Sequence, residues 1–384
     1  MTKKYYKSKY IVLEDRVIID NYMIVEDGLI KGFAKEAEQG AEIIDFGQTY
    51  LAPGLVDTHI HGYKNEDIMD AKPGALNIIS KGILEMGVTS FLPPTLTAST
   101  EDLNEACRII GQEHKDVEGA KVRGIFLEGP YFTEKYKGAQ NLSYMKDPSI
   151  EELKKWKDLS DGLVNKIALA PERQGVEEFI KEARKMGVYI ALGHSDASYE
   201  EALKAIDAGA NIFVHTYNGM SGLHHREPGM VGAALNTKTT ISELICDGHH
   251  VHPMAAKVVM EAKGRDHVAL ITDCMRAGGM PDGDYSLGEF PVVVKDGTAR
   301  LKEGNLAGSI LKLKDAVANV YSWRLATAFE AIQMASLVPA KSVGLDGVCG
   351  KLKEGYAADF IVLDENLELL KTFLDGQLKY ELVG

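Results

Sequence analysis

The sequence predicts an α/β protein: a (β/α)8 barrel carrying a small β-sandwich domain formed from both termini. From about residue 54 to residue 349, eight short apolar segments are separated mostly by helical segments, a pattern that closes into a barrel. Residues 1–53 and 350–384 are instead rich in β-branched and aromatic residues. Ionisable side chains follow several strands of the middle region, where barrel enzymes carry their active sites.

The two ends of the chain have the same strand-rich composition. Asp27-Gly28 is a hairpin signal between two of the expected N-terminal strands. The strands that we expect here cover residues 10–13, 16–19, 22–25, 29–30, 43–46, 50–51, 359–363, 367–370 and 372–376. We therefore expect residues 1–53 and 350–384 to form one small β-domain, and residues 54–349 to form the barrel.

The middle region alternates strand and helix in chain order. The barrel strands are expected at residues 55–61, 88–92, 122–127, 166–170, 188–192, 211–214, 241–246 and 268–272. A helix over residues 73–86 has proline at its start and Gly87 just past its end, as helices prefer. Further helices are expected at 101–113 and 176–186, after Ser149, and after the capping residue Ser198. Residues 285–305 alternate like strands and are interpreted as an insertion after the eighth strand.

Composition narrows the class of protein. The net charge is −13, from 43 basic and 56 acidic residues, which argues against nucleic acid or an anionic membrane as a partner. Four scattered cysteines suggest reduced, buried thiols. The first six residues lack the apolar stretch of a secretion signal, and no apolar run approaches the ~18 residues of a membrane span. We expect a cytoplasmic protein.

A metal site is expected where the barrel strands end. His59 and His61 are two residues apart on the first strand, so their side chains point the same way. Other candidates end the third, fifth, sixth and eighth strands, and all should converge on one mouth of the barrel: Glu128, His194, His215 and Asp273. Four imidazoles and one glutamate suit one or two divalent cations, with zinc or iron favoured. Asp273 is a candidate ligand or base, or merely a turn or helix-capping aspartate after a strand.

Several motifs carry a resemblance to a known family. The first His-x-His pair, the strand-end histidines, the strand-eight aspartate and the segment 355–362 resemble the amidohydrolase superfamily. Within it, the chain resembles the N-acetylglucosamine-6-phosphate deacetylases over nearly its whole length. The matching motifs are Leu127-Glu128-Gly129-Pro130-Tyr131-Phe132, Lys137-Gly138-Ala139-Gln140, Gly193-His194-Ser195, residues 215–220, His225-Arg226-Glu227-Pro228-Gly229, residues 247–251, Ile271-Thr272-Asp273 and Leu306-Ala307-Gly308-Ser309.

The resemblance implies roles for individual residues. Glu128, His194 and His215 would hold the principal metal, and His59 and His61 a second one. Asp273 would transfer protons, and His250 would contact the acetyl carbonyl and the tetrahedral intermediate. The phosphorylated amino sugar would be met by Asn218, Gly219 and Arg226, and by the pocket residues Ala139, Gln140, Leu306, Ala307, Gly308 and Ser309. In the family that arginine comes from the neighbouring subunit, so a homodimer is implied.

The implied reaction is hydrolysis of N-acetylglucosamine 6-phosphate to glucosamine 6-phosphate and acetate, a step of amino-sugar catabolism. Deacetylation of the galactosamine epimer remains open, because the two sugars differ in one stereocentre. Cyclic-amide hydrolysis is disfavoured, since those enzymes commonly place a metal-bridging lysine on the fourth strand, which ends here in Ala168-Leu169-Ala170. A non-catalytic relative would be expected to lose ligands, and this chain keeps them all.

The remaining candidates have weaker signals. His224, His225, His249 and His252 lie in the same loops as the site and are expected to support it or to lie at an interface. His114 and His267 follow helices and are expected in solvent. Cys274 has no paired base and is interpreted as a packing residue. The departures from the family pattern are Cys274 and Gly219, where relatives often have alanine.

Overall fold

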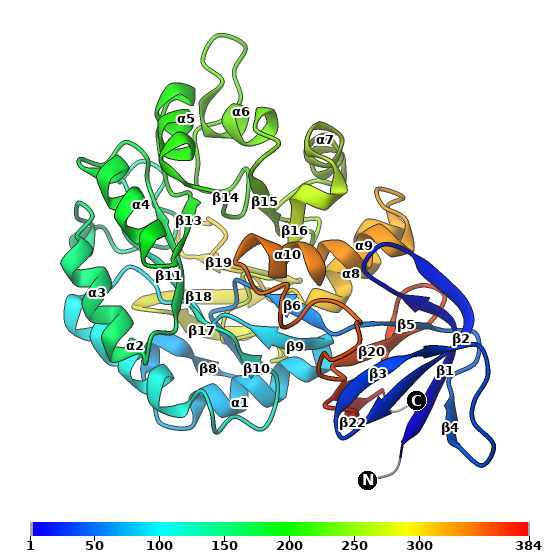
Figure 1. Ribbon diagram of the computed structural model, residues 1–384. Coiled ribbons are helices and arrows are strands. Elements are labelled where there is room, and N and C mark those ends of the chain that lie inside the picture. Colours follow the sequence, from blue (N-terminus) through cyan, green and yellow to red (C-terminus); the bar gives the residue numbers. More distant parts are fainter. Residues whose placement is uncertain (1–2, 383–384) are drawn as a thin grey trace.

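The computed structural model describes residues 3–382, and Figure 1 shows a barrel with a β-sheet lobe beside it. Residues 1 and 2 begin the N-terminal segment in which we expected no secretion signal, and they lie outside the described residues. Between residues 55 and 270, eight strands form the barrel wall in chain order: β6 (Leu55–Asp57), β9 (Val88–Phe91), β11 (Ile125–Tyr131), β12 (Val164–Leu169), β13 (Tyr189–Leu192), β14 (Ile212–Phe213), β15 (Ile241–Leu244) and β16 (Val268–Leu270).

Neighbouring strands of the barrel wall pair in parallel. Strand β6 pairs with β9, and β11 to β16 pair consecutively. The two remaining seams are closed by isolated parallel bridges, Pro94 to Phe126 and Ile60 to Cys274. A short strand, β10 (Lys121–Val122), extends β9 on one side. The predicted barrel is therefore present, and all eight of its strands were expected from the sequence.

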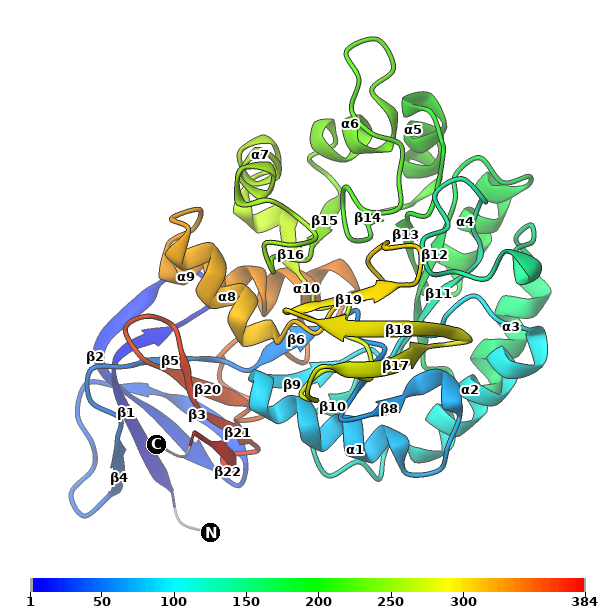
Figure 2. The ribbon, with the colours of Figure 1, turned by 180° about the vertical axis from the view of Figure 1, so that it is seen from behind.

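Helices follow the wall strands and pack outside them (Figures 1 and 2). They are α1 (Ala75–Gly82), α2 (Thr100–Glu113), α3 (Ile150–Leu159), α4 (Val176–Lys185), α5 (Tyr199–Ala208), α6 (Gly229–Asn236), α7 (Pro253–Lys263) and α8 (Leu313–Ser322), followed by α9 (Ala328–Met334) and α10 (Leu337–Ser342). Short 3-10 turns cover Ile68–Asp70, Ile83–Met86, Leu142–Tyr144 and Arg265–His267. Ser149 and Ser198 cap α3 and α5, as predicted.

The helix expected over residues 73–86 is shorter than predicted. It ends at Gly82 and continues as a 3-10 turn to Met86, with Gly87 in the left-handed conformation that glycine favours. A Cβ atom at Gly82 would approach Cδ1 of Tyr63 to 2.7 Å. The glycine that weakens the helix is thus required by the packing of Tyr63.

Both termini contribute strands to one continuous eight-stranded sheet. Its order is β22-β21-β20-β5-β1-β2-β3, with β4 paired to β1. The strands are β1 (Lys4–Val12), β2 (Val17–Glu26), β3 (Leu29–Ala34), β4 (Glu42–Asp45), β5 (Tyr50–Pro53), β20 (Phe360–Leu363), β21 (Leu369–Leu374) and β22 (Gln377–Glu381). The pairing of β20 with β5 places the C-terminal segment beside the N-terminal one.

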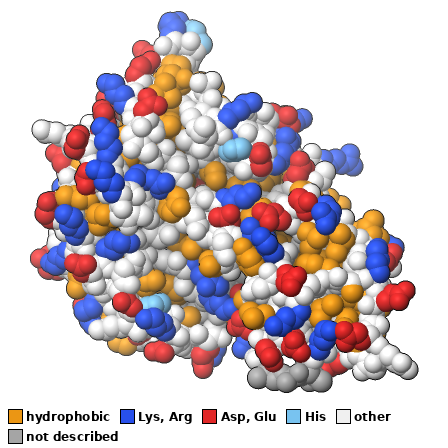
Figure 3. Space-filling model, viewed as in Figure 1, with side chains coloured by type: hydrophobic (Ala, Val, Ile, Leu, Met, Phe, Trp, Pro, Cys, Tyr) orange, Lys and Arg blue, Asp and Glu red, His pale blue; other side chains and the backbone are white. Residues whose placement is uncertain are grey.

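The predicted insertion after the eighth strand is a small antiparallel sheet. Its strands are β17 (Gly283–Leu287), β18 (Phe290–Lys295) and β19 (Thr298–Leu301), and Figure 2 shows them in front of the barrel. A short hairpin of β7 (Gly62–Tyr63) and β8 (Glu66–Asp67) follows the first barrel strand. On the face drawn in Figure 3, basic and acidic side chains are interspersed. Within residues 3–382, no helix combines the length and apolarity of a membrane span.

Candidate active site

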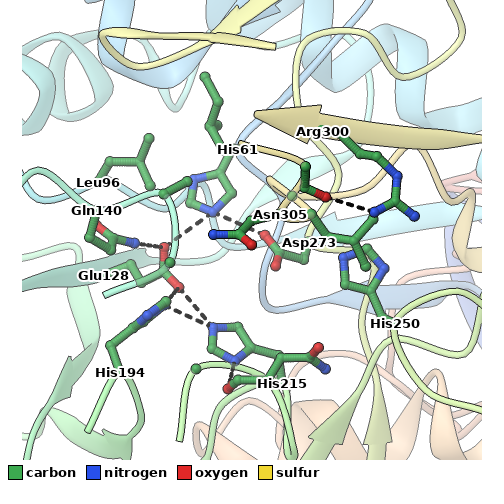
Figure 4. A pocket seen from close by; sticks show the side chains of 18 residues that line it. His61, Leu96, Glu128, Gln140, His194, His215, His250, Asp273, Arg300 and Asn305 are labelled. Atoms are coloured by element: carbon green, nitrogen blue, oxygen red, sulfur yellow. Dashed lines mark hydrogen bonds and ion pairs between the residues drawn. The ribbon is translucent and has the colours of Figure 1, made fainter. Parts of the chain in front are cut away.

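A cavity of about 400 Å³ opens where the barrel strands end (Figure 4). Every wall strand ends there because parallel strands all run the same way around a barrel. Strand-end residues, the turn 304–308 and the inserted sheet supply its lining: His61, Leu96, Glu128, Gly138, Ala139, Gln140, His194, His215, Asn218, Gly219, His250, Asp273, Leu287, Arg300, Gly304, Asn305, Leu306 and Gly308.

The five predicted metal ligands form one buried cluster centred on Glu128. Its Oε1 atom lies 3.3 Å from Nε2 of both His59 and His215, and 3.4 Å from Nε2 of His194. Its Oε2 atom lies 3.3 Å from Nε2 of His61. The groups His59/His61/Glu128 and Glu128/His194/His215 each bring their ligand atoms within 4.8 Å of one another. The carboxylate is shared between the two groups.

The tautomers of two histidines fit a bound cation. Nδ1 of His194 lies 3.0 Å from the carbonyl oxygen of Tyr136, and Nδ1 of His215 lies 3.0 Å from that of Asn218. A carbonyl only accepts, so each Nδ1 carries the proton and donates it. Each Nε2 therefore faces Glu128, and in the neutral ring its lone pair is available for metal ligation. The donor set of imidazoles and one carboxylate suits zinc or iron.

The histidines of the cluster differ in their pKa values. Burial alone would lower the pKa of His59 and His61, but the carboxylates of Asp273 and Glu128 outweigh it and raise these pKa values to about 9 and about 10. Burial lowers the pKa of His215 below its ordinary value despite the help of Glu128. Without a cation, the first histidine pair thus carries positive charge that balances the buried carboxylates.

Asp273 lies directly beside the first histidine pair. Its Oδ1 atom lies 3.2 Å from Nε2 of His61 and 3.5 Å from Nε2 of His59. Burial would raise the pKa of Asp273, but the charges of these two histidines lower it to about 2. The backbone at Asp273 is left-handed, with φ 51°, and its amide donates to the carbonyl of His59 over 2.8 Å. Left-handed backbone also occurs at His194 and His215, which is typical of strained functional positions.

His250 reaches the cavity from the loop after β15. Nδ1 of its ring lies 2.6 Å from Oδ2 of Asp247, whose Oδ1 accepts the backbone amides of His249 and His250 over 2.8 Å each. Burial would raise the pKa of Asp247, but its bonds to His250 outweigh this and lower it. An ionised Asp247 therefore accepts the Nδ1 proton of His250 and fixes the orientation of its ring.

The predicted sugar-pocket residues divide into two groups. Ala139, Asn218, Gly219, Leu306 and Gly308 line the cavity, as does Gln140. Ala307 and Ser309 are buried and are not among the lining residues; Ser309 Oγ instead donates to the carbonyl of Thr272 over 2.6 Å. Their predicted contact with sugar stays a prediction.

Gln140 has a second contact that the sequence did not suggest. Its Nε2 donates to Oε2 of Glu128 over 2.8 Å, and its Oε1 accepts the backbone amide of Thr97 over 2.8 Å. The side chain is thus buried and already engaged in orienting a metal ligand.

Gly219 leaves room for a candidate ligand. Its φ is 61°, and a Cβ atom there would approach Nδ1 of His194 to 2.9 Å.

Arg226 is not brought to this cavity within one chain. It is exposed on the loop between β14 and α6, which projects at the top of Figure 1, and its Nη1 lies 2.8 Å from Nε2 of His225. The predicted role of Arg226 in a neighbouring subunit stays a prediction. Of the other loop histidines, His224, His225 and His249 are exposed, and His252 caps α7.

Sequence reasoning missed several residues around the cavity. Arg300 and Asn305 line it from the insertion and the turn that follows, a region interpreted only as extra β-structure. Below the cluster, Lys166 and Glu243 form a fully buried ion pair. Each is a charged residue inside a largely buried barrel strand, and that pattern could have revealed the pair.

Comparison with known proteins agrees with the geometry. The family described as "Amidohydrolase family" matches residues 50–379. The N-acetylglucosamine-6-phosphate deacetylase of Vibrio furnissii is 41% identical over 358 residues, covering 93% of this chain and 90% of that protein. The N-acetylgalactosamine-6-phosphate deacetylase of Escherichia coli O157:H7 is 39% identical over 377 residues, covering 97% and 98%.

Solved structures extend the comparison to the fold. The N-acetyl-D-glucosamine-6-phosphate deacetylase of Mycobacterium smegmatis, in complex with N-acetyl-D-glucosamine-6-phosphate, superposes with a TM-score of 0.92 at 27% identity. The match covers 99% of this chain and 100% of that one. Fold and sequence thus agree with these relatives over nearly the whole length, and the chain belongs to the amidohydrolase family.

Proposed function

We propose that this protein is a metal-dependent hydrolase that converts N-acetylglucosamine 6-phosphate and water to glucosamine 6-phosphate and acetate. One observation carries the proposal: five ligands and Asp273 converge on a cavity large enough for a small ligand. The substrate is favoured by the likeness to the Vibrio furnissii enzyme. Amino-sugar catabolism in the cytoplasm is the setting that this reaction suggests.

The five candidate ligands would bind the metal that activates water and the amide. His59, His61, Glu128, His194 and His215 would hold one or two divalent cations, zinc or iron by their ligand chemistry. A bound cation lowers the pKa of water, which makes water a stronger nucleophile at neutral pH. It also polarises the amide carbonyl, which makes the carbon a better electrophile. Gln140 keeps Oε2 of Glu128 in place for this cluster.

Asp273 is proposed to move the proton. As an ionised carboxylate it can accept a proton from the attacking water. As the oxygen of water bonds to the acetyl carbon, the C–N bond breaks and the amine nitrogen takes that proton from Asp273. The products are acetic acid and the free amine, and the aspartate is ionised again; the acid then gives its proton to the amine or to solvent and leaves as acetate.

His250 is proposed to stabilise the carbonyl oxygen during the attack. Asp247 holds its ring at Nδ1, so Nε2 is free to face the cavity and, when it carries a proton, to donate to a developing oxyanion. Arg226, from a second copy of the chain, would offer its planar guanidinium to the phosphate, with Asn218 adding an amide donor. This proposal implies a homodimer.

A second candidate substrate is N-acetylgalactosamine 6-phosphate. The Escherichia coli O157:H7 protein that acts on it matches 97% of this chain at 39% identity. Cyclic amides are disfavoured, because Nζ of Lys166, on the fourth barrel strand, lies 2.5 Å from Glu243 Oε1 and is engaged there.

The terminal sheet is proposed to be a separate β-sandwich domain of residues 1–53 and 350–384, beside a barrel of residues 54–349. A small apolar core of its own supports this division: it joins Tyr6, Ile11, Met23, Phe360 and Phe373. The pairing of β20 with β5 would then tie the two ends of the chain together.

Acetate release tests the proposed function. Metal-loaded protein is assayed with both epimeric sugar phosphates and with unphosphorylated N-acetylglucosamine, beside an Asp273→Asn variant. Fast release that requires both the phosphate and Asp273 supports the proposal, and the faster epimer identifies the preferred substrate. Absence of release from either phosphate, with bound metal measured in the same sample, would rule it out.

A further inference from the structure

A buried ion pair lies directly beneath the ligand cluster. Lys166 on β12 and Glu243 on β15 have no exposed side-chain surface, and their Nζ and Oε1 atoms are 2.5 Å apart. The ammonium also lies 3.8 Å from the ring centroid of Phe126 and 3.4 Å from the carbonyl oxygen of Thr58. A buried ion pair often contributes less to stability than apolar side chains of the same size. Stability alone therefore does not account for this ion pair in the barrel interior.

The two carboxylate oxygens of Glu243 have different surroundings. Oε1 accepts from Lys166 and, over 3.1 Å, from the hydroxyl of Thr58. Oε2 is buried, has no hydrogen-bond partner within residues 3–382 and lies 3.6 Å from Nδ1 of His59. Nδ1 of His59 is likewise buried without a partner among the described residues. Two unsatisfied polar atoms thus face each other behind a metal ligand.

We infer that Glu243, fixed by Lys166, is a positioning residue for His59. Its Oε2 atom accepts the Nδ1 proton of His59, so that the ring presents its Nε2 lone pair to a cation shared with Glu128. A carboxylate behind a ligating histidine fixes the tautomer and makes the ligand more basic. The inference rests on the proposed metal-dependent function.

His194 and His215 differ from His59 in the partners of their Nδ1 atoms. His194 and His215 direct their Nδ1 protons to backbone carbonyls, which carry no net charge. Only one cation position, formed by His59, His61 and Glu128, would therefore depend on Glu243. The position formed by Glu128, His194 and His215 should not respond to it. This difference separates positioning from general support of the fold.

The test compares cation binding at the two positions. Zinc is counted by elemental analysis after dialysis at fixed free Zn²⁺, and cobalt is followed by its visible absorption, for the parent, Glu243→Gln and Lys166→Met/Glu243→Gln. The second variant removes both charges together, so it carries the test if the first fails to fold. Lys263→Met is the matched control, because Lys263 is also buried and donates only to backbone carbonyls and the hydroxyl of Thr240.

We expect two cations in the parent and in Lys263→Met. Both Glu243 variants should keep one cation at parental affinity and bind the other about 10- to 100-fold more weakly. In a His59→Asn background, adding Glu243→Gln should change neither affinity, because the two residues act as one unit. The single remaining cobalt spectrum should match that of the His59→Asn variant.

Unchanged binding of both cations in Glu243→Gln would overturn the inference, as would equal weakening of both positions or the same loss in Lys263→Met. Failure of the proposed function is distinguishable. A parent that binds two cations but releases no acetate would refute the deacetylase proposal, while the binding comparison would still decide the role of Glu243.

Discussion

Nδ1 of His250 donates to Oδ2 of Asp247 over 2.6 Å, and this bond decides which ring atom faces the cavity. Replacing Asp247 with asparagine removes the carboxylate that accepts the Nδ1 proton and holds the ring in place. We expect kcat to fall about 10- to 100-fold, with a smaller change in KM, because the lost contact acts on the developing oxyanion. Steady-state acetate release measures both constants.

The chain offers a matched control for that change. Asp266 lies 3.1 Å from Nδ1 of His267 in a second His–Asp pair, which is far more exposed. Asp266→Asn should leave both constants unchanged. An equal loss in the two variants, or an unaltered kcat in Asp247→Asn, would contradict the role of His250.

Asp273→Asn should abolish most of the turnover. The amide cannot accept the proton that water must lose, so we expect kcat to fall about 10²- to 10⁴-fold. Zinc content should stay at the parental value if Asp273 works as a proton carrier rather than as a ligand. Elemental analysis beside the assay separates these roles, and loss of zinc in proportion to activity would assign Asp273 to the metal instead.

Cation binding should depend on pH differently at the two positions. Without a cation, His59 and His61 have pKa values of about 9 and about 10, so both are protonated at neutral pH and a cation must displace their protons. Affinity there should rise about tenfold per pH unit for each displaced proton, and level off above the folded-state pKa values.

The second position should respond less. The lowered pKa of His215 leaves that ring unprotonated at neutral pH, so no proton is lost from it on binding. Competition with a chelator of known affinity, between pH 6 and pH 9, measures both slopes. Equal slopes at the two positions would refute the assignment of protons.

Gln140→Leu should weaken the cluster without unfolding the protein. The change leaves Oε2 of Glu128 without its amide donor, and loss of such a partner weakens metal binding or activity by about 10- to 100-fold. Gln333 is the matched control, since it is also buried and donates to the backbone carbonyl of Leu13 over 2.9 Å.

Gln333→Leu should lower the thermal midpoint while zinc affinity stays at the parental value. Thermal unfolding and zinc titration of the two variants therefore give opposite patterns. If Gln140→Leu lost only stability, its contact with Glu128 would have no role in metal binding.

The sequence by itself determined the barrel and the set of candidate ligands. Strand-to-helix alternation is a local pattern, and the His59-x-His61 spacing fixes a shared face within one strand. The strand-end positions of Glu128, His194, His215 and Asp273 then follow from the geometry of parallel strands. These expectations need no knowledge of which side chains touch.

Only the tertiary structure decided what lies behind and around those ligands. The contacts of Lys166 with Glu243, and of Gln140 with Glu128, join residues 77 and 12 positions apart. Arg300 and Asn305 line the cavity because the inserted sheet and the turn after it border the barrel mouth. Periodicity reports which face of a strand or helix is buried, but not which partner it meets, because that partner is set by how separate elements pack.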